Sequence, residues 1–134
     1  EEIDGVPVTE IGDEAFTICS KLKNITIPDS VTEIGNTVFY SCRSLESITI
    51  PDSVKKIGSN AFSYCYSLTN VTIPDGIPAI GYMAFHECTS LESITLECAP
   101  PDNMCNSFAV FVGFSEFTRG NAIFTFECTA KVTR

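Results

Sequence analysis

A block of 23 residues is repeated four times in succession, and this period restricts the possible folds more than any other feature of the chain. Each copy opens with an Ile-Gly pair, and a phenylalanine, a cysteine and a leucine follow at fixed distances. These residues are Ile11-Gly12, Ile34-Gly35, Ile57-Gly58 and Ile80-Gly81; Phe16, Phe39, Phe62 and Phe85; Cys19, Cys42, Cys65 and Cys88; and Leu22, Leu45, Leu68 and Leu91. Self-similarity at a period of roughly 20 to 29 residues is typical of a solenoid, whose coils stack and share one core.

Two short stretches of each copy have the pattern of β-strands. Ile25 and Ile27 flank a polar threonine, and the same alternation recurs in every copy, which predicts a strand with one buried face. A Pro-Asp-Ser or Pro-Asp-Gly turn ends this strand in the first three copies, and a second extended stretch follows. The three-residue spacing of Phe39, Cys42 and Leu45 then predicts a tight helical turn or an irregular arc. The sequence therefore predicts a mostly β solenoid of short parallel strands, turns and arcs.

The period divides the chain into three parts. Residues 1–10 have the pattern of the end of a preceding or N-terminal partial repeat, and residues 11–96 hold the four repeats. After these the period fails, and six phenylalanines crowd into residues 97–134. Alternating residues near the C-terminus favour strands there. We therefore expect residues 97–134 to form a C-terminal β cap over the fourth coil, the alternative being an exposed aromatic patch.

The composition is that of one folded, acidic domain. Hydrophobic residues make up 44% of the chain and charged residues 19%, which is enough apolar material for a core. No apolar run approaches the roughly 20 residues that span a bilayer, and the first ten residues lack the order of a signal peptide. A formal net charge of −9 repels phosphate backbones and anionic lipid head groups. We therefore expect neither a nucleic-acid partner nor insertion into a membrane.

One candidate partner surface is the outward face of the first predicted strand of each copy. Every copy carries a threonine there, preceded two residues earlier by asparagine or serine. The residues are Thr26, Thr49, Thr72 and Thr95, with Asn24, Ser47, Asn70 and Ser93. Such a strip of hydrogen-bonding groups could bind a protein or a glycan. The alternative is that threonine, a good strand former, merely solvates this face.

A second candidate surface is marked by the tyrosines, which stand at positions where other copies carry different side chains. Tyr40, Tyr64 and Tyr66 lie on the arc around the cysteine of the second and third copies. They could form one aromatic patch with Arg43 and His86, whereas Tyr82 lies elsewhere in its copy. Tyrosine is enriched at interface hot spots, so these six residues are candidates for partner binding. Surface tyrosines without a role are also common.

Residues with catalytic chemistry are scarce. His86 is the single histidine, no serine, cysteine or aspartate stands at a spacing that suggests a triad, and there is no glycine-rich phosphate loop. The aspartates of the Pro-Asp turns could form a calcium-binding row, but the preference of aspartate for turns explains them more simply. We therefore expect no enzymatic activity and no cofactor.

The cysteines number seven. The four that repeat with the coil are expected to form a buried stack of thiols that fill space like small hydrophobic groups. The paired spacings that zinc sites need are absent, so we expect no metal. Cys98, Cys105 and Cys128 lie in or beside the predicted cap, where one disulfide is a possibility in an oxidising compartment.

The repeat has the pattern Ile-Gly-x-x-Ala-Phe-x-x-Cys-x-Ser-Leu-x-x-Ile-Thr-Ile-Pro-Asp-Ser-Val. In the third copy it stands as Ile57-Gly58-Ser59-Asn60-Ala61-Phe62, then Cys65, Ser67-Leu68 and Val71-Thr72-Ile73-Pro74-Asp75. This pattern resembles the leucine-rich repeat of the BspA-like, or Treponema pallidum type, surface proteins, and the match covers residues 11–98. The departures are local: Val38 replaces the alanine before Phe39, and Glu97-Cys98 replaces Pro-Asp in the fourth copy.

The resemblance implies a leucine-rich-repeat solenoid in a surface-exposed or secreted protein of host-associated bacteria or protozoa. It further implies a link to adhesion and to the binding of extracellular-matrix proteins. We therefore expect a non-enzymatic domain, at the cell surface or outside the cell, that binds a protein or glycan partner such as a host matrix component. The alternative function is structural: a spacer within a larger surface protein, or a scaffold that self-associates end to end through an uncapped N-terminal coil.

Overall fold

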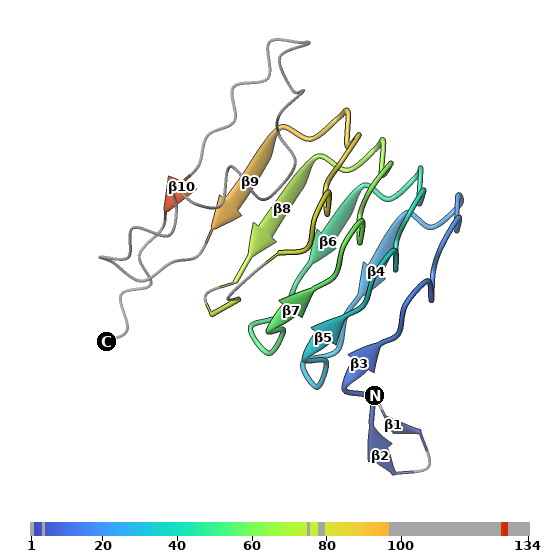
Figure 1. The fold of residues 1–134 in the computed structure, drawn as a ribbon, viewed down its shortest axis with the longest axis vertical. Coiled ribbons are helices and arrows are strands. Elements are labelled where there is room, and N and C mark those ends of the chain that lie inside the picture. The colour runs from blue at the N-terminus through green and yellow to red at the C-terminus, as the bar shows by residue number, and fades with distance from the viewer. Residues whose placement is uncertain (1, 4, 75, 78–79, 97–126, 129–134) are drawn as a thin grey trace.

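The computed structural model describes residues 2–3, 5–74, 76–77, 80–96 and 127–128. In these residues the chain winds into a β-solenoid whose coils lie on one another in sequence order (Figure 1). The predicted mostly β solenoid is therefore confirmed.

Two parallel sheets run along the stack. The longer sheet has the strand order β10-β9-β8-β6-β4, and the shorter sheet has the order β3-β5-β7. The strands of the longer sheet are β4 (Asn24–Thr26), β6 (Ser47–Thr49), β8 (Asn70–Ile73), β9 (Ser93–Leu96) and β10 (Glu127–Cys128). Those of the shorter sheet are β3 (Glu10–Ile11), β5 (Glu33–Ile34) and β7 (Lys56–Ile57). A bridge between Ile57 and Ile80 continues the shorter sheet into the fourth coil.

The register places equivalent residues of successive coils side by side. Ile25 pairs with Ile48, Ile48 with Val71, and Val71 with Ile94. The same rule holds in the shorter sheet, where Ile11 pairs with Ile34. Because each coil has the same length, every inward side chain meets its own counterpart in the next coil, and the apolar residues form continuous rows, here called ladders.

The phenylalanine ladder is the centre of the core. Its ring centroids are 5.4 Å apart between Phe16 and Phe39, 5.2 Å between Phe39 and Phe62, and 5.1 Å between Phe62 and Phe85. Neighbouring rings are stacked, with interplanar angles of 14° or less. Leucine, cysteine and isoleucine ladders surround the rings and are likewise buried in the second, third and fourth coils. One core thus runs through the whole stack.

The repeated glycine is required where two coils approach most closely. A Cβ atom built on Gly58 would lie 2.5 Å from the carbonyl carbon of Gly35 and 2.6 Å from the amide nitrogen of Asn36. A Cβ on Gly81 would overlap the backbone of Gly58 in the same way. Because backbone atoms cannot rotate aside, any side chain at these positions would push the coils apart.

The arc of each coil is built from turns, and the described residues contain no helix. The expectation of a helical turn is therefore replaced by the irregular arc that was its alternative. Two residues of each arc have a positive φ, between 51° and 61°, and none of these residues is glycine: Glu14, Ile18, Thr37, Ser41, Asn60, Tyr64, Met83 and Glu87. Left-handed residues interrupt a helix, so none of the four described arcs continues as one.

Hydrogen bonds between coils hold each arc in place. The amides of Glu14, Phe16 and Ile18 donate to the carbonyls of residues 36, 38 and 40 in the second coil, at 3.0, 2.9 and 2.8 Å. The same three bonds recur between the second and third coils and between the third and fourth. In every case the coil nearer the N-terminus donates the N–H group. Each arc is therefore joined to the next by the same three backbone hydrogen bonds.

The first coil is less buried than the others. Phe16, Leu22 and Ile25 are only partly buried, and Cys19 is exposed. The expectation of a buried thiol is therefore wrong for Cys19, because none of the described residues covers the N-terminal side of its coil in the way that the first coil covers Cys42. Nothing lies within 4 Å of a Cβ built on Gly12, in contrast to Gly58.

The flanking segments are described in part. β1 (Glu2–Ile3) and β2 (Val6–Pro7) pair with each other in antiparallel fashion and join neither sheet. The predicted cap at residues 97–134 lies outside the described residues apart from β10, which adds a parallel strand beside β9. Cys98, Cys105 and the side chain of Cys128 also lie outside them, so the possible disulfide stays a prediction.

Candidate binding surface

Four aromatic side chains from three coils meet on the outer side of the arcs. The ring of Tyr64 lies at the centre of the group, with centroid distances of 5.3 Å to Tyr40, 6.1 Å to Tyr66 and 5.6 Å to His86. All three contacts are edge-to-face, the arrangement that the charge distribution of aromatic rings favours. All four side chains are half-buried. Together with Arg43 they form what is here called the aromatic surface.

The backbone of the arc determines where these rings lie. Tyr64 occupies one of the left-handed positions, with a φ of 61°, and its amide donates to the carbonyl of His86 at 2.8 Å. A bulky residue with positive φ is uncommon and carries a conformational cost. The next coil therefore holds Tyr64 in a strained position at the centre of the group.

Arg43 completes the aromatic surface with a fixed positive charge. Its guanidinium carbon lies 5.7 Å from the centroid of the Tyr66 ring, and its Nε donates to the Ser41 hydroxyl at 3.3 Å. Stacking of this kind on an aromatic face is favourable for arginine. The structure thus brings together five of the six residues that the sequence suggested around the arcs.

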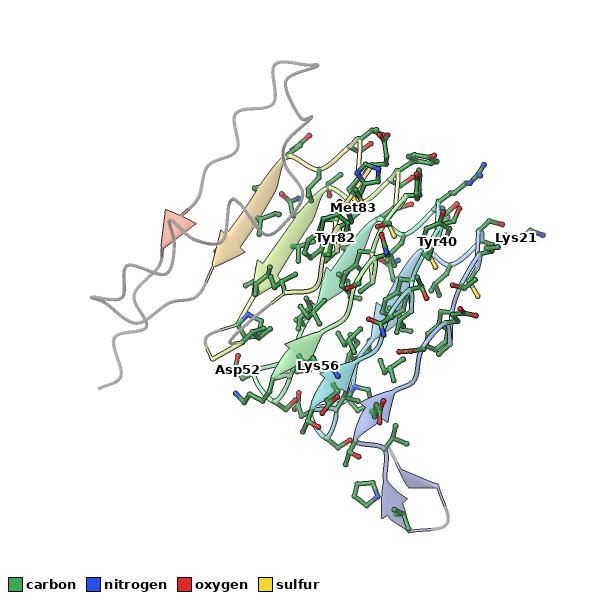
Figure 2. The ribbon with its side chains drawn as sticks, viewed as in Figure 1. Lys21, Tyr40, Asp52, Lys56, Tyr82 and Met83 are labelled. Atoms are coloured by element: carbon green, nitrogen blue, oxygen red, sulfur yellow. The ribbon has the colours of Figure 1, made fainter. Side chains whose placement is uncertain are left out.

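Tyr82, the sixth, is separate from this group. Its side chain is 64% exposed and contacts none of the aromatic rings of the described residues. Figure 2 labels Tyr40 and Tyr82 at different places on the coils. Tyr82 occupies the position of Asp13, Asn36 and Ser59, at the start of the arc. It therefore serves better as a control than as part of the aromatic surface.

Sequence reasoning missed Ile18, which extends this face onto the first coil. Ile18 is 65% exposed and has a φ of 59°, and its amide donates to the Tyr40 carbonyl at 2.8 Å. An exposed, β-branched, left-handed residue is unfavourable on three counts. The available signal was its position, which is the one that Tyr64 occupies in the third coil.

The threonine strip lies on the outer face of the longer sheet, as predicted. Thr26, Thr49 and Thr72 are exposed, and Thr95 is half-buried. Beside the strip the polar side chains bond to each other, with Ser47 donating to Asn24 at 3.0 Å and Ser93 donating to Asn70 at 2.6 Å. A shallow hollow of about 520 Å³ lies where the strip meets the Pro-Asp turns, and its lining includes Asp29, Thr49, Asp52 and Thr72. The strip is uniform and uncharged, so it offers little that would distinguish one partner from another.

The buried thiols are in an environment that makes them unreactive. The Sγ atoms of Cys42, Cys65 and Cys88 donate to the carbonyls of Phe16, Phe39 and Phe62 at 3.1, 3.2 and 3.1 Å. Burial raises the pKa of Cys42 to about 11 and that of Cys88 to about 12, and it raises the pKa of Cys65 as well. Because the thiolate is the reactive form, these side chains act as packing groups.

Two further kinds of functional feature are absent from the described residues. Within them, no three His, Cys, Asp or Glu side chains gather as metal ligands would. None of the described segments is a long apolar helix of the kind that crosses a bilayer.

Comparison with known proteins agrees with the geometry. The family model described as "BspA type Leucine rich repeat region" matches residues 6–109 in six copies. The crystal structure of a leucine-rich repeat protein from T. pallidum is 32% identical, with a TM-score of 0.60, and the match covers 70% of this chain and 55% of that one. A leucine-rich repeat protein from Bacteroides ovatus is 34% identical, with a TM-score of 0.50, over 68% of this chain and 36% of that one. The chain thus spans about half or less of the length of these relatives. The comparison with curated proteins found no match.

Proposed function

This chain belongs to the BspA-type leucine-rich repeat family, and from that premise we propose that it is a non-enzymatic domain that binds a partner protein through the aromatic surface. Leucine-rich repeat domains generally mediate protein interactions, and a solenoid presents an extended surface suited to that role. We further propose that the domain acts in adhesion outside the cell, with an extracellular-matrix protein as its partner. The family resemblance supports this proposal.

The grouping of Tyr40, Tyr64 and Tyr66 beside Arg43 is the observation that carries the proposal. The repeated phenylalanine, cysteine, leucine and isoleucine fill the core of each coil, so packing does not require tyrosine on the arcs. Tyrosine and arginine are among the side chains that are enriched at binding hot spots. The strain at Tyr64 adds weight, because strained backbone positions gather at functional sites.

Substitution of Tyr64 by asparagine tests the proposal without disturbing the fold. Asparagine tolerates a positive φ, so Tyr64→Asn removes the central ring while leaving the left-handed turn in place. Capture of the domain would be measured on a panel of purified extracellular-matrix proteins, with a glycan array alongside, and Tyr82→Ala would serve as the matched control. We expect Tyr64→Asn to weaken capture roughly tenfold or more while the domain stays folded by circular dichroism, because relief of the left-handed strain offsets the lost ring contacts. Equal capture by both variants would contradict the proposal, and binding to glycans alone would replace the protein partner by a glycan.

A second candidate function is a scaffold that stacks end to end, and it would use the N-terminal side of the first coil. The carbonyls of Asp13, Ala15 and Thr17 accept no hydrogen bond from the described residues, although their counterparts in the next coils each accept one. The partly buried Phe16 and the empty space beside Gly12 lie on the same coil. The N-terminal side of the first coil therefore offers carbonyl oxygens as hydrogen-bond acceptors. A surface that stacks on it would have to donate N–H groups.

End-to-end stacking predicts a mass that rises with concentration in light scattering. Replacing Phe16 by glutamate would place a charge on this side of the coil and should return the protein to a monomer. A mass that stays monomeric at every concentration would remove the scaffold and leave the binding function standing.

A further inference from the structure

The positively charged side chains of the repeats differ in whether they form an ion pair with a carboxylate. Lys23 pairs with Glu46 at 3.6 Å, Lys56 pairs with Glu33 at 3.1 Å, and Lys55 donates to the Asp52 carbonyl at 2.9 Å. Three cations of the described repeats, Lys21, Arg43 and Lys55, therefore form no ion pair with a carboxylate there. A protein with a net charge of −9 has more acidic than basic groups, so cations without an acidic partner stand out.

Two of these three cations, Arg43 and Lys21, belong to the aromatic surface or its border. Arg43 is in contact with Tyr66, and Lys21 occupies in the first coil the position next to the counterpart of Arg43. Figure 2 shows the labelled Lys21 and Tyr40 on the first two coils, at the end where the arcs lie. Arg43 and Lys21 therefore place two positive charges along the arcs of the first two coils, whereas the fourth coil carries the carboxylate of Glu87 at the position that Tyr64 occupies in the third.

The guanidinium of Arg43 is also held in an orientation that suits a carboxylate ligand. Its Nε is occupied by the Ser41 hydroxyl and its plane is held near the Tyr66 ring, so the two terminal nitrogens are the groups that remain for a partner. A guanidinium held in this way can donate two parallel hydrogen bonds to a carboxylate, and it loses little side-chain entropy when it does so.

Building on the proposed function, we propose that the aromatic surface binds an extended acidic segment of the partner protein, in which a carboxylate meets Arg43 and neighbouring apolar side chains pack on Tyr40 and Tyr64. The apolar residue Ile18 continues the surface on the first coil. A peptide fits better than a sulfated glycan, because two cations on an acidic protein suit one or two carboxylates spaced by apolar groups. A dense row of sulfates would meet repulsion from the surrounding surface.

The test uses three fluorescent probes on the full chain: a twelve-residue peptide that repeats the unit Glu-Pro-Leu, its twin with glutamine in place of glutamate, and heparin. Fluorescence anisotropy should show the acidic peptide binding at least about tenfold more tightly than the glutamine twin, as expected for charge-assisted hydrogen bonds. Arg43→Gln should remove that preference and Arg43→Lys should reduce it. Lys55→Gln removes the same charge away from the aromatic surface and should leave the preference intact.

Several results would overturn the acidic-segment inference: equal binding of the two peptides, an unchanged preference in Arg43→Gln, tighter binding of heparin than of the acidic peptide, or no binding of either peptide. Tyr64→Asn separates this inference from the function on which it rests. If Tyr64→Asn weakens both peptides while the glutamine twin binds as well as the acidic one, the aromatic surface is a binding site without an acidic preference. If Tyr64→Asn changes the affinity of no probe, the proposed function itself is wrong.

Discussion

Replacing Gly58 by alanine should test the central feature of the fold, which is the close contact between successive coils. The added Cβ would lie 2.5 Å from the carbonyl carbon and oxygen of Gly35, about 1 Å nearer than an ordinary van der Waals contact. The same atom added to Gly12 would meet nothing within 4 Å. The two substitutions change the same atoms in the same repeat position, so any difference between them measures the approach of the neighbouring coil.

The expected cost follows from the bonds beside Gly58. Its amide donates to the Ile34 carbonyl at 2.8 Å, and the Lys55 amide donates to the Thr32 carbonyl at 2.7 Å. Moving the coils apart by about 1 Å weakens both bonds, each of which contributes roughly 0.5–1.5 kcal/mol. The overpacked contact itself costs about 1–3 kcal/mol. We therefore expect Gly58→Ala to lower the free energy of unfolding by about 3 kcal/mol.

Gly12→Ala should have the opposite sign. Without a clash, alanine reduces the conformational freedom of the unfolded chain and raises stability by about 0.4–1 kcal/mol. Urea denaturation followed by circular dichroism measures both values, and an unchanged m-value shows that both variants unfold to a similar extent. If the two variants shift the urea midpoint equally, close approach of the coils is not the reason for the repeated glycine.

Three further predictions follow from the core and the arcs. Stability should fall as the pH rises through the ordinary thiol pKa of 9.0, by about 1.4 kcal/mol per buried thiol between pH 8 and pH 10: thiols ionise in the unfolded chain while Cys42, Cys65 and Cys88 stay protonated in the fold. Urea midpoints at pH 8 and 10 measure this loss of stability, which Cys65→Ala should reduce. Equal midpoints at the two pH values would contradict the prediction. Phe62→Ala should cost about 3–5 kcal/mol, measured by thermal melting, and a cost below 1 kcal/mol would contradict the stacked core. Ile18→Asn should stabilise the domain by about 1 kcal/mol, because asparagine accepts a positive φ more readily, and a lower urea midpoint would refute the strain assigned to this residue.

The sequence was sufficient to predict the fold because the repeat averages out local ambiguity. Any single copy of the pattern around Ile48 could be a strand or part of a helix, but the fixed period requires one conformation that stacks on itself. This constraint led to the two sheets, the register and the phenylalanine ladder. It could not reveal that Cys19 is exposed, because exposure depends on what covers a coil and not on its sequence.

The details of the candidate site were harder to predict. The proximity of Tyr40, Tyr64 and Tyr66 followed from their places in the repeat, but their edge-to-face contacts depend on side-chain rotamers. The positive φ of Ile18 and Tyr64 had no signal, because glycine usually marks such positions and the chain places other residues there. In this fold the neighbouring coil enforces the turn through backbone hydrogen bonds, so the local sequence need not favour it.

This last point bears on how such a domain can acquire a partner. In a loop, the residue at a left-handed position is restricted because that residue must itself stabilise the turn. Here the amide of Tyr64 is bonded to the His86 carbonyl of the next coil, so the stack maintains the turn and the side chain is free to vary. The same position carries isoleucine, serine and glutamate in the other coils, which shows that the backbone accepts very different groups. A surface built at these positions can therefore change its chemistry without changing the fold, whereas the threonine strip must keep side chains suited to strands. This difference is the physical reason to look for specificity on the arcs.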